Sequence, residues 1–433
     1  MAPSPIDLLL KPVRTLLQKE YTGGIVLFIS VLLALFWANS PWAASYHALW
    51  ETRFSVGFAG HRLEEPLHVW INDGLMAVFF FVIGLELKRE FMAGELSTVK
   101  KATLPMMAAL GGMLVPALIY LAFNAGKASE AGWGIPMATD IAFALGILSL
   151  SGKHIPASVK VFLSALAVAD DLGAILVIAF FYTAHIAVTP LMIAFALLLL
   201  LGLANAAGIR NPLVYLLTGI AIWLCFLASG VHATIAGVLL AFTIPARTKI
   251  NELEFASCLK TYTLQFERAM PQRGTLTTPE QHHTIEQIKK LALAAETPLQ
   301  KIEHKLHGLV TFGIMPLFAL ANAGIVLNGN LFTALENPVS MGVLFGLFAG
   351  KLCGILLFTW IMIRFRLSSL PVGANWRHIT GVSLLAGVGF TMSLFVADLA
   401  FDHETLIGQA KTAILIASAL AGVSGAFFLR RLS

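Results

Sequence analysis

Charged residues are scarce in this sequence. Asp, Glu, Lys and Arg together make up 12% of its 433 residues, and hydrophobic residues make up 58%. A soluble domain usually carries about 25% charged residues because its surface must be hydrated. So few charges cannot cover a soluble globule of this length, and most of the surface must therefore face lipid. The apolar stretches agree, since they repeatedly reach the roughly 20 residues that cross a bilayer.

Cysteine is also rare. Cys225 and Cys353 lie inside apolar runs and Cys258 lies in a polar segment, so a disulfide framework is not expected. The net charge of +5 is distributed over the gaps between apolar runs and forms no basic domain, which argues against nucleic acid as a partner. The long polar segment 245–298 contains no catalytic arrangement, and neither an enzyme nor a cofactor is predicted.

The apolar runs predict an all-α integral membrane protein with about twelve transmembrane helices in one domain, residues 1–433. Their approximate positions are Gly24–Trp37, Trp70–Leu87, Leu104–Phe123, Gly134–Leu150, Val161–Tyr182, Pro190–Leu203, Val214–Phe226, Val231–Ile244, Leu309–Leu327, Met341–Ile363, Ile379–Leu399 and Ala410–Leu429. The first run follows basic residues and resembles a signal peptide, but the many later runs favour an uncleaved helix. The preceding stretch, Ile6–Leu17, is interpreted as an interfacial helix.

Lys and Arg favour one side of the membrane. With the N-terminus inside, the outer loops carry only Arg53, Arg62 and Lys127, and the cytoplasmic connections carry the larger share. That share comprises Lys88, Arg89, Lys100, Lys101, Lys153, Arg210, Arg364, Arg366, Arg377, Arg430 and Arg431. Both chain termini are therefore expected in the cytoplasm.

Two polar segments interrupt the pattern. Residues 45–68 contain Gly57 and Gly60 near their middle and are predicted to form an external hairpin, through which a homodimer could assemble. Residues 245–298 are long and charged, and we interpret them as a cytoplasmic loop insertion with helical parts.

Two adjacent carboxylates lie in the middle of one apolar run. Asp170 and Asp171 follow Ala169 and precede Gly173. A charge at the centre of a membrane helix costs about 2.5–3.5 kcal/mol, so such residues are functional candidates by default. Carboxylate oxygens suit hard cations, and a close pair titrates as a coupled unit. The pair therefore predicts a site for protons or a small cation, and the alternative is a neutralised brace between helices.

Further polar groups lie in other apolar runs. Asp140 follows Thr139 and comes after Pro136, which predicts either an interrupted helix or a simple N-cap. Lys351 lies about ten residues from either end of its run, too deep for snorkelling, and so requires a carboxylate or helix C-terminal carbonyls. The stretch 385–393, with two glycines and two hydroxyls, predicts either an unwound segment or close helix packing. His232 near a helix end is either a packed neutral histidine or a titrating one.

Together these residues resemble the NhaA family of sodium/proton antiporters over nearly the whole chain. The adjacent aspartates, Thr-Asp one helix earlier and a later membrane lysine form the most specific part of the match. The matching segments are Ala138–Gly146, Ala167–Gly173, Gly84–Glu90, Ser229–Thr234 and Phe318–Gly324.

This resemblance implies a secondary active antiporter in a bacterial inner membrane that exports sodium, or lithium, in exchange for protons. It further implies inverted-topology repeats and two interrupted helices, the fourth and eleventh, that cross near the midplane. Asp170 and Asp171 would bind sodium or protons in alternation, with Thr139 as an extra ligand. Asp140 would compensate facing helix N-termini and Lys351 facing C-termini, with Lys351 also paired to Asp170.

Regulation by pH through a cytoplasmic charge cluster is also implied. The matching positions are Glu86, Arg89, Glu90, Glu303, His304 and His307, with His232 as a further candidate. The sequence departs from the family pattern at Gln300, where a basic residue is familiar, and in the long segment 245–298.

Three other classes fit parts of the pattern. An intramembrane aspartyl protease would place one aspartate in Gly-x-Gly-Asp, which is absent. A cation channel could line a pore with the same carboxylates. Channels built as rings, however, usually need symmetry around the pore axis, and this single chain contains one asymmetric set of charged residues. An accessory membrane subunit with structural charges is the third alternative. Among transporters, another ion-coupled transporter is the alternative to an antiporter.

Overall fold

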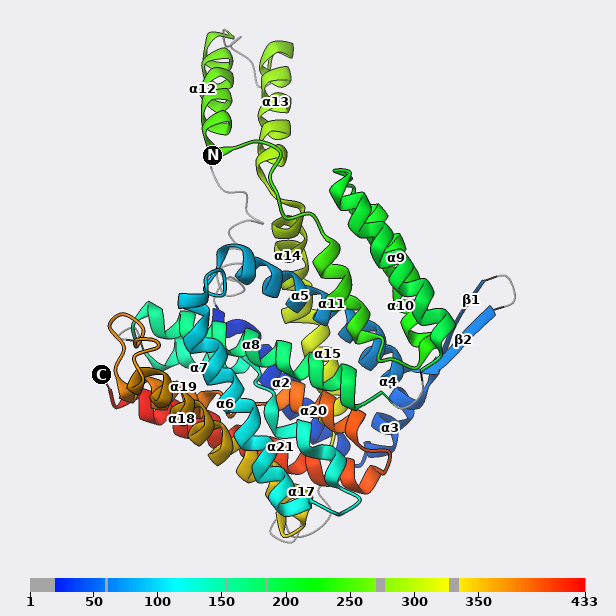
Figure 1. Ribbon diagram of the computed structural model, residues 1–433. Coiled ribbons are helices and arrows are strands. Elements are labelled where there is room, and N and C mark those ends of the chain that lie inside the picture. Colours follow the sequence, from blue (N-terminus) through cyan, green and yellow to red (C-terminus); the bar gives the residue numbers. More distant parts are fainter. Residues whose placement is uncertain are drawn as a thin grey trace.

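The computed structural model describes residues 20–58, 61–152, 155–183, 186–269, 277–326 and 335–432. Helices dominate it (Figure 1). The N-terminal elements are α2 (Glu20–Ala38), α3 (Ala43–Glu51), β1 (Arg53–Phe58), β2 (His61–Pro66), α4 (Leu67–Val69), η1 (Trp70–Leu75), α5 (Met76–Ala93), α6 (Val99–Asn124), η2 (Glu130–Met137), α7 (Ile141–Ser151) and α8 (Ala157–Phe181). The later elements are α9 (Val188–Ala206), α10 (Pro212–Ser229), α11 (Thr234–Thr243), α12 (Glu252–Arg268), α13 (Pro279–Ala295), α14 (Pro298–Leu309), η3 (Val310–Ile314), α15 (Met315–Asn322), α17 (Pro338–Phe345), η4 (Gly346–Gly350), α18 (Lys351–Arg364), α19 (Trp376–Leu385), α20 (Phe390–Ala400) and α21 (Glu404–Arg430).

The predicted membrane spans are present. Ten helical stretches in the described chain are long and apolar enough to cross a bilayer, and α19 with α20 forms a further span bent by 46°. With the short apolar helix α11, these stretches match the twelve predicted runs. The multi-helix membrane fold is therefore confirmed, whereas the predicted interfacial helix at Ile6–Leu17 lies outside the described residues.

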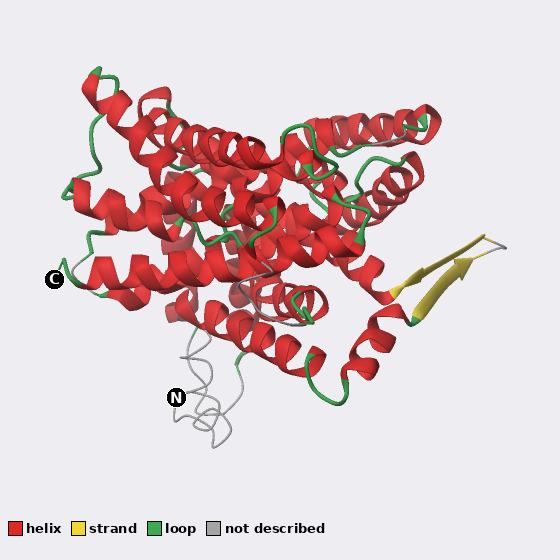
Figure 2. Cartoon of the chain, turned by 90° about the horizontal axis from the view of Figure 1, so that it is seen from below, coloured by secondary structure: helices red, strands yellow, loops and turns green. Residues whose placement is uncertain are grey.

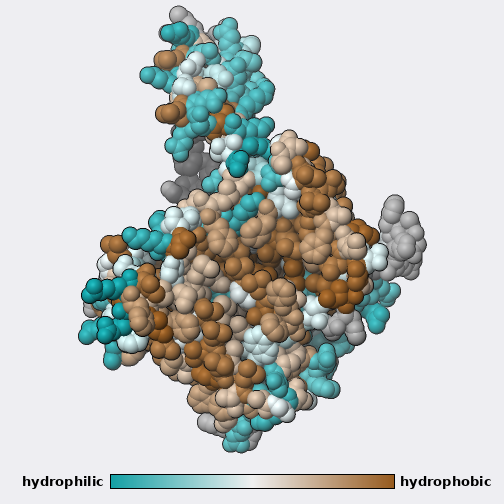
Figure 3. All heavy atoms as spheres, viewed as in Figure 1, coloured by the Kyte–Doolittle hydropathy of each residue, from teal (hydrophilic) through white to brown (hydrophobic). Residues whose placement is uncertain are grey.

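Exposed apolar side chains cover the outer helices. Leu199 of α9 and Leu217 of α10 are 66% and 60% exposed, and brown apolar residues dominate the visible face of the helical body (Figure 3). Such a large exposed apolar surface would aggregate in water but is stabilised in lipid. The helical pair α12 and α13 is mostly hydrophilic and projects from this body (Figures 1 and 3).

Two boundaries differ from the sequence prediction. The eighth span, α11, has only 10 residues, or about 15 Å of helix, and does not cross a bilayer of about 30 Å alone. Gly230 separates it from α10 with a φ of 78°, a conformation that glycine adopts readily. The ninth span begins at Pro298 and not near Leu309, because Thr297 caps a helical turn too polar for hydropathy to detect.

Two spans are interrupted in the middle. Residues 138–140 separate η2 from α7, and residues 386–389 separate α19 from α20. The breaks meet, because the Asp140 N–H donates to the Val388 carbonyl over 2.7 Å. The two interrupted, crossing helices implied by the resemblance are therefore confirmed.

Each interrupted span lies between two long helices. α6 and α8 flank the first, while α17–η4–α18 and α21 flank the second. α6 and the stretch α17–α18 run antiparallel: Gly111 packs against Gly354, Pro116 against Gly350, and Asn124 donates to the Pro338 carbonyl. The same order of elements thus occurs twice with opposite direction, as expected for inverted-topology repeats.

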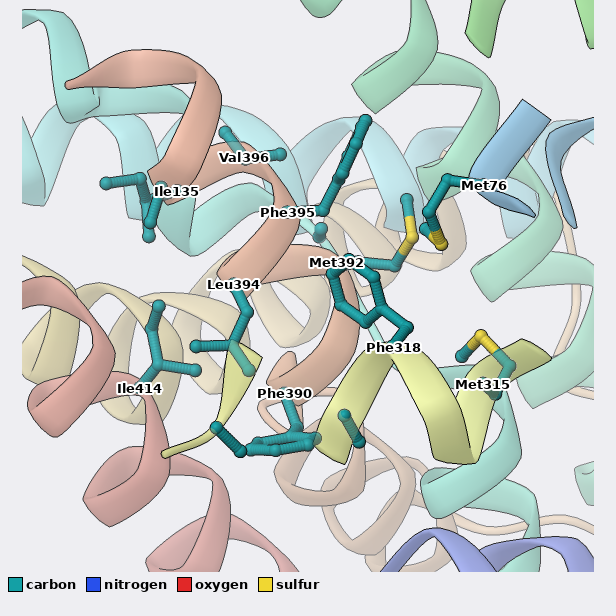
Figure 4. Packing of buried hydrophobic residues seen from close by; sticks show 14 of the residues in the cluster. Met76, Ile135, Met315, Phe318, Phe390, Met392, Leu394, Phe395, Val396 and Ile414 are labelled. Carbon is teal, nitrogen blue, oxygen red and sulfur yellow. The ribbon is translucent and has the colours of Figure 1, made fainter. Parts of the chain in front are cut away.

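The interior around α20 is apolar and tightly packed. Met392 and Phe395 of α20 lie in one buried cluster with Phe318 of α15 and Met76 of α5 (Figure 4). The Phe395 ring lies 6.3 Å from that of Phe318, in an edge-on arrangement typical of aromatic cores. This cluster packs against the second half of the interrupted span, beside the site described below.

Strands β1 and β2 form an antiparallel hairpin that projects from the helical body (Figure 2). Arg53 pairs with Pro66 and Phe58 with His61. The hairpin lies within the predicted segment 45–68. Its external location and its use in a homodimer stay predictions.

The contact between α6 and α18 yields a stability prediction. A Cβ at Gly354 would collide with the Gly111 carbonyl oxygen, so Gly354→Ala should destabilise the protein by about 1–3 kcal/mol through overpacking. Gly202→Ala is the matched control, because no atom lies within 4 Å of its added Cβ. Thermal melting in detergent should separate the two variants, and equal melting temperatures would contradict this packing.

Candidate ion-binding site

The adjacent aspartates lie in the middle of α8. Both are fully enclosed, with Asp170 0% and Asp171 1% exposed. Their helical neighbours are small, including Ala167 and Ala169, so surrounding helices approach closely at this level. Adjacent positions on a helix diverge by about 100°, and the two carboxyl groups therefore have different surroundings.

Asp170 is held by α18 and by the break between η2 and α7. Its Oδ2 forms an ion pair with the Lys351 ammonium and accepts a hydrogen bond from Thr139 Oγ1 over 2.6 Å. Its Oδ1 is buried and has no hydrogen-bond partner among the described residues. Thus Oδ2 already has Lys351 and Thr139 as partners, whereas Oδ1 has none among the described residues.

Asp171 is buried without such support. Its Oδ1 also lacks a hydrogen-bond partner in the described part of the chain. An unsatisfied buried polar atom is costly and requires an explanation. Two unsatisfied carboxyl oxygens on consecutive residues make this level of α8 the candidate ion-binding site.

Asp140 behaves differently. Its Oδ1 accepts from the Phe143 N–H over 3.1 Å, and its Oδ2 accepts from the Thr391 N–H over 3.2 Å and from Thr391 Oγ1 over 2.5 Å. It therefore caps both α7 and α20 at the positive ends of their dipoles. Asp140 therefore acts as an N-cap and lies where its negative charge offsets the helix dipoles, as both sequence interpretations required. Both of its carboxyl oxygens already have hydrogen-bond partners.

Thr391 was not among the candidate residues from the sequence. It lies in the first turn of α20, after the second break. The only sequence signal was its hydroxyl inside the glycine-rich stretch 385–393, and the contact with Asp140 depends on the crossing of the two breaks.

Lys351 begins α18 immediately after the π-helical turn η4 and is 0% exposed. π-helical turns often mark functional sites. Gly112 of α6 lies over the lysine stem. The ammonium pairs with Asp170, and no hydrogen bond to the C-terminal carbonyls of η2 or α19 occurs among the described residues.

Comparison with known proteins agrees with this geometry. The family model described as Na+/H+ antiporter 1 matches residues 14–429. The chain belongs to the Na+/H+ antiporter 1 family. It is 49% identical to an Na(+)/H(+) antiporter NhaA of Oleidesulfovibrio alaskensis over 99% of this chain and 96% of the relative. It is 47% identical to Na(+)/H(+) antiporter NhaA 2 of Syntrophotalea carbinolica, covering 100% of this chain and 99% of the relative.

A weaker likeness joins the chain to the structure of the sodium proton antiporter MjNhaP1 from Methanocaldococcus jannaschii. It has a TM-score of 0.44 and 14% sequence identity, and covers 97% of this chain and 98% of the other. The predicted fold class is confirmed instead by membership of the Na+/H+ antiporter 1 family, the apolar spans and the crossing helices.

Four of the predicted pH-response residues of this family member meet at the end of α5. Arg89 contacts Glu303 over 3.0 Å, Glu90 over 3.3 Å and Glu86 over 3.8 Å. His304 and His307 are exposed on α14. His232 lies apart from them, with its Nε2 2.9 Å from the Tyr182 carbonyl oxygen.

The buried ion pair yields a second prediction. Lys351→Met should strongly destabilise the protein, by an amount of the order of 3–5 kcal/mol, because it leaves the Asp170 carboxylate buried without a cation. Asp170→Asn in the same chain should restore most of the loss, since the unpaired charge is then absent. Melting of both single variants and the double variant in detergent measures the coupling. Strictly additive losses would contradict the pair.

Proposed function

We propose that this chain is a secondary active sodium/proton antiporter of the bacterial inner membrane. The observation that carries the proposal is the pair of unpartnered carboxyl oxygens, Asp170 Oδ1 and Asp171 Oδ1, enclosed beside a buried lysine. Membership of the Na+/H+ antiporter 1 family and the names of the relatives support the same function.

Sodium is the cargo that these oxygens suit. Hard cations prefer carboxylate and hydroxyl oxygen ligands. Asp170 and Asp171 would each supply one oxygen, and Thr139 would add a neutral one because its hydroxyl already reaches Asp170. Lithium has the same charge and the same preference for oxygen, and is the second expected cargo.

Asp140 and Lys351 would serve the site by compensating charge. Asp140 offsets the N-termini of α7 and α20, and its oxygens are occupied, so we assign it no cargo. Lys351 stabilises the ionised form of Asp170 when no cation is bound. A cation that binds Asp170 must compete with this ammonium, which couples sodium binding to the contact between α8 and α18.

Protons would complete the cycle. Once sodium leaves, protonation neutralises the carboxylates so that they can return through a low-dielectric interior. If more than one proton returns per sodium, net charge moves and the exchange responds to the membrane potential, at about 2.3 kcal/mol per charge for 100 mV. We therefore propose electrogenic exchange.

The cluster formed by Glu86, Arg89, Glu90 and Glu303 would set the pH response, with His304, His307 and His232 as further candidates. By the distribution of Lys and Arg, it would face the cytoplasm together with both termini and the insertion 245–298. On the opposite, external side of the membrane, the β1–β2 hairpin would form the contact of a homodimer.

Substitution of either aspartate tests the site. Asp170→Asn and Asp171→Asn should each reduce sodium-driven proton movement in proteoliposomes by at least about 100-fold, since an amide cannot exchange a proton for a cation. Asp402→Asn is the control, because Asp402 lies exposed in a loop between α20 and α21. Near-parental turnover in both aspartate variants would remove them from the site.

Competition between the two ions separates an antiporter from a cation channel. If both ions use one carboxylate site, lowering the pH should raise the apparent sodium KM, because protonated carboxyls bind no cation. The experiment uses sealed liposomes with a sodium gradient as the only driving force and with the potential clamped. Proton movement against its gradient is expected. Sodium flux without coupled proton flux would instead identify a channel.

A further inference from the structure

The first half of one interrupted span, η2, is supported by side chains from its neighbours. It is a 3₁₀ helix of 8 residues, and 3₁₀ runs longer than about four residues are uncommon because their hydrogen bonds are poorly aligned. Three hydroxyl groups from three helices donate to carbonyls in or beside it. They are Tyr120 of α6 to Ser129 over 2.8 Å, Tyr182 at the end of α8 to Ala131 over 2.7 Å, and Ser393 of α20 to Ile135 over 2.8 Å.

The Tyr182 hydroxyl bonds to both ends of one turn of η2. It donates to the Ala131 carbonyl and accepts from the Gly134 N–H over 3.1 Å. These two residues have the spacing that a 3₁₀ turn joins. The ring approaches so closely because residue 134 is a glycine, since a Cβ there would lie 2.7 Å from the hydroxyl oxygen. The hydroxyl therefore fits one particular turn of η2.

Tyr182 differs from the other two hydroxyl residues because it follows the helix of the ion site. Asp170 lies earlier in α8, by about 18 Å at 1.5 Å per residue. At that level Thr139 donates to Asp170 over 2.6 Å. Hydrogen bonds thus join the interrupted span to α8 at two levels, one at the site and one at the C-terminal end of α8.

Apolar packing fills the interval between these levels. Ile175 and Ile178 of α8 share a buried cluster with Ile135 of η2, and Phe181 meets Trp133 edge-on with ring centroids 5.0 Å apart. Apolar burial is non-directional, whereas a hydrogen bond requires its partner at one distance and direction. In the described part of the chain, no hydrogen bond besides the two of the Tyr182 hydroxyl joins α8 to η2. This hydroxyl therefore selects the register of η2 on α8.

Contacts with the second interrupted span fix a different distance. Thr139 also donates to the Ala386 carbonyl over 3.0 Å, and the Asp140 N–H donates to the Val388 carbonyl. These bonds join the two breaks to each other. The separation between the first break and the carboxylates of α8 is independent of them.

We propose that Tyr182 is a positioning residue that holds η2 in the register that places the Thr139 hydroxyl at the sodium ion. The proposal rests on the proposed antiport function and deepens it. Thr139 lies just beyond the end of η2, so a slip of η2 along α8 moves its hydroxyl away from Asp170. The cation would then lose one neutral ligand, while both carboxylates would remain.

Tyr182→Phe tests the proposal because it removes the hydroxyl and keeps the ring. The apparent sodium KM in proteoliposomes at constant pH should rise about tenfold, the effect of one lost polar contact to an ion. The maximum rate should stay within about twofold of the parental value, since proton return uses the unchanged carboxylates. Tyr215→Phe is the matched control and should keep the parental KM: its hydroxyl also donates to a backbone carbonyl, that of Ile209 before α10, over 2.9 Å.

A Thr139→Val background shows whether Tyr182 acts through Thr139. This variant should itself raise the sodium KM, and adding Tyr182→Phe should raise it no further, because the hydroxyl to be positioned is absent. Gly134→Ala reaches the same contact from η2, since its Cβ would displace the Tyr182 hydroxyl. It should raise the KM as Tyr182→Phe does, and it takes the place of that variant if Tyr182→Phe does not fold.

Melting in detergent gives the sodium affinity without transport. Bound sodium stabilises the folded protein, so the melting temperature rises with sodium concentration. In Tyr182→Phe this rise should begin at a sodium concentration about tenfold higher than in the parent or in Tyr215→Phe.

A parental KM in Tyr182→Phe would overturn the proposal, and so would an equal rise of the KM with and without the Thr139 hydroxyl. A lower maximum rate with an unchanged KM would also overturn it, since that result would reflect general damage to the fold. Absence of sodium/proton exchange in the parent chain would instead refute the proposed function.

Discussion

The structure depends on holding four charged side chains in an interior that excludes water. Asp140, Asp170, Asp171 and Lys351 are each at most 1% exposed. Isolated, each would destabilise a membrane helix, and an unpaired buried charge is among the costliest defects a fold can contain. Two helices are interrupted at this level, and the backbone N–H groups and the Thr139 and Thr391 hydroxyls at the breaks reach Asp140 and Asp170.

The hydrogen bonds divide the carboxylates into two kinds. Asp140 has both oxygens occupied, by the first turns of α7 and α20, and is best understood as part of the scaffold. Asp170 and Asp171 each retain one buried oxygen without a partner among the described residues. A bound cation or proton would satisfy these two adjacent oxygens, which makes this pair the candidate site. The distinction rests on hydrogen-bond geometry, since all three aspartates are equally buried.

The surrounding packing makes this arrangement rigid on one side and adaptable on another. Gly111 and Gly354 allow α6 and α18 to touch along their backbones, which fixes the depth of Lys351. The contact of α20 with α5 and α15 instead involves Met76, Met315 and Met392 (Figure 4). Methionine adapts to changes of shape at little cost, so this interface tolerates small shifts of the half-helix beside the site.

The membrane spans and the candidate site were predictable from the sequence. The free-energy cost of placing a charged side chain in lipid depends on the residues of its own helix, which can be read from the sequence. The spacing of apolar runs predicts the membrane spans, and Asp170 and Asp171 indicate the candidate site because they are the only charged residues in their run. The resemblance to the NhaA family supplied the crossing of the interrupted helices and the Asp170–Lys351 pair. Hydropathy alone could not supply the start of α14 at Pro298, since its first turns are polar.

Tertiary structure alone decided which atoms meet. Thr391 reaches Asp140 across a separation of 251 residues, and Lys88 reaches α11 across a separation of 154, so no local pattern predicts either contact. The partners of Asp140 Oδ2 depend on where the two breaks cross, and those of Asp170 Oδ2 depend on where Thr139 and Lys351 lie in the folded chain. Residue type and hydrophobic period determine which groups are buried, but only the folded chain determines which of them are satisfied, because a hydrogen bond requires a partner at one distance and direction.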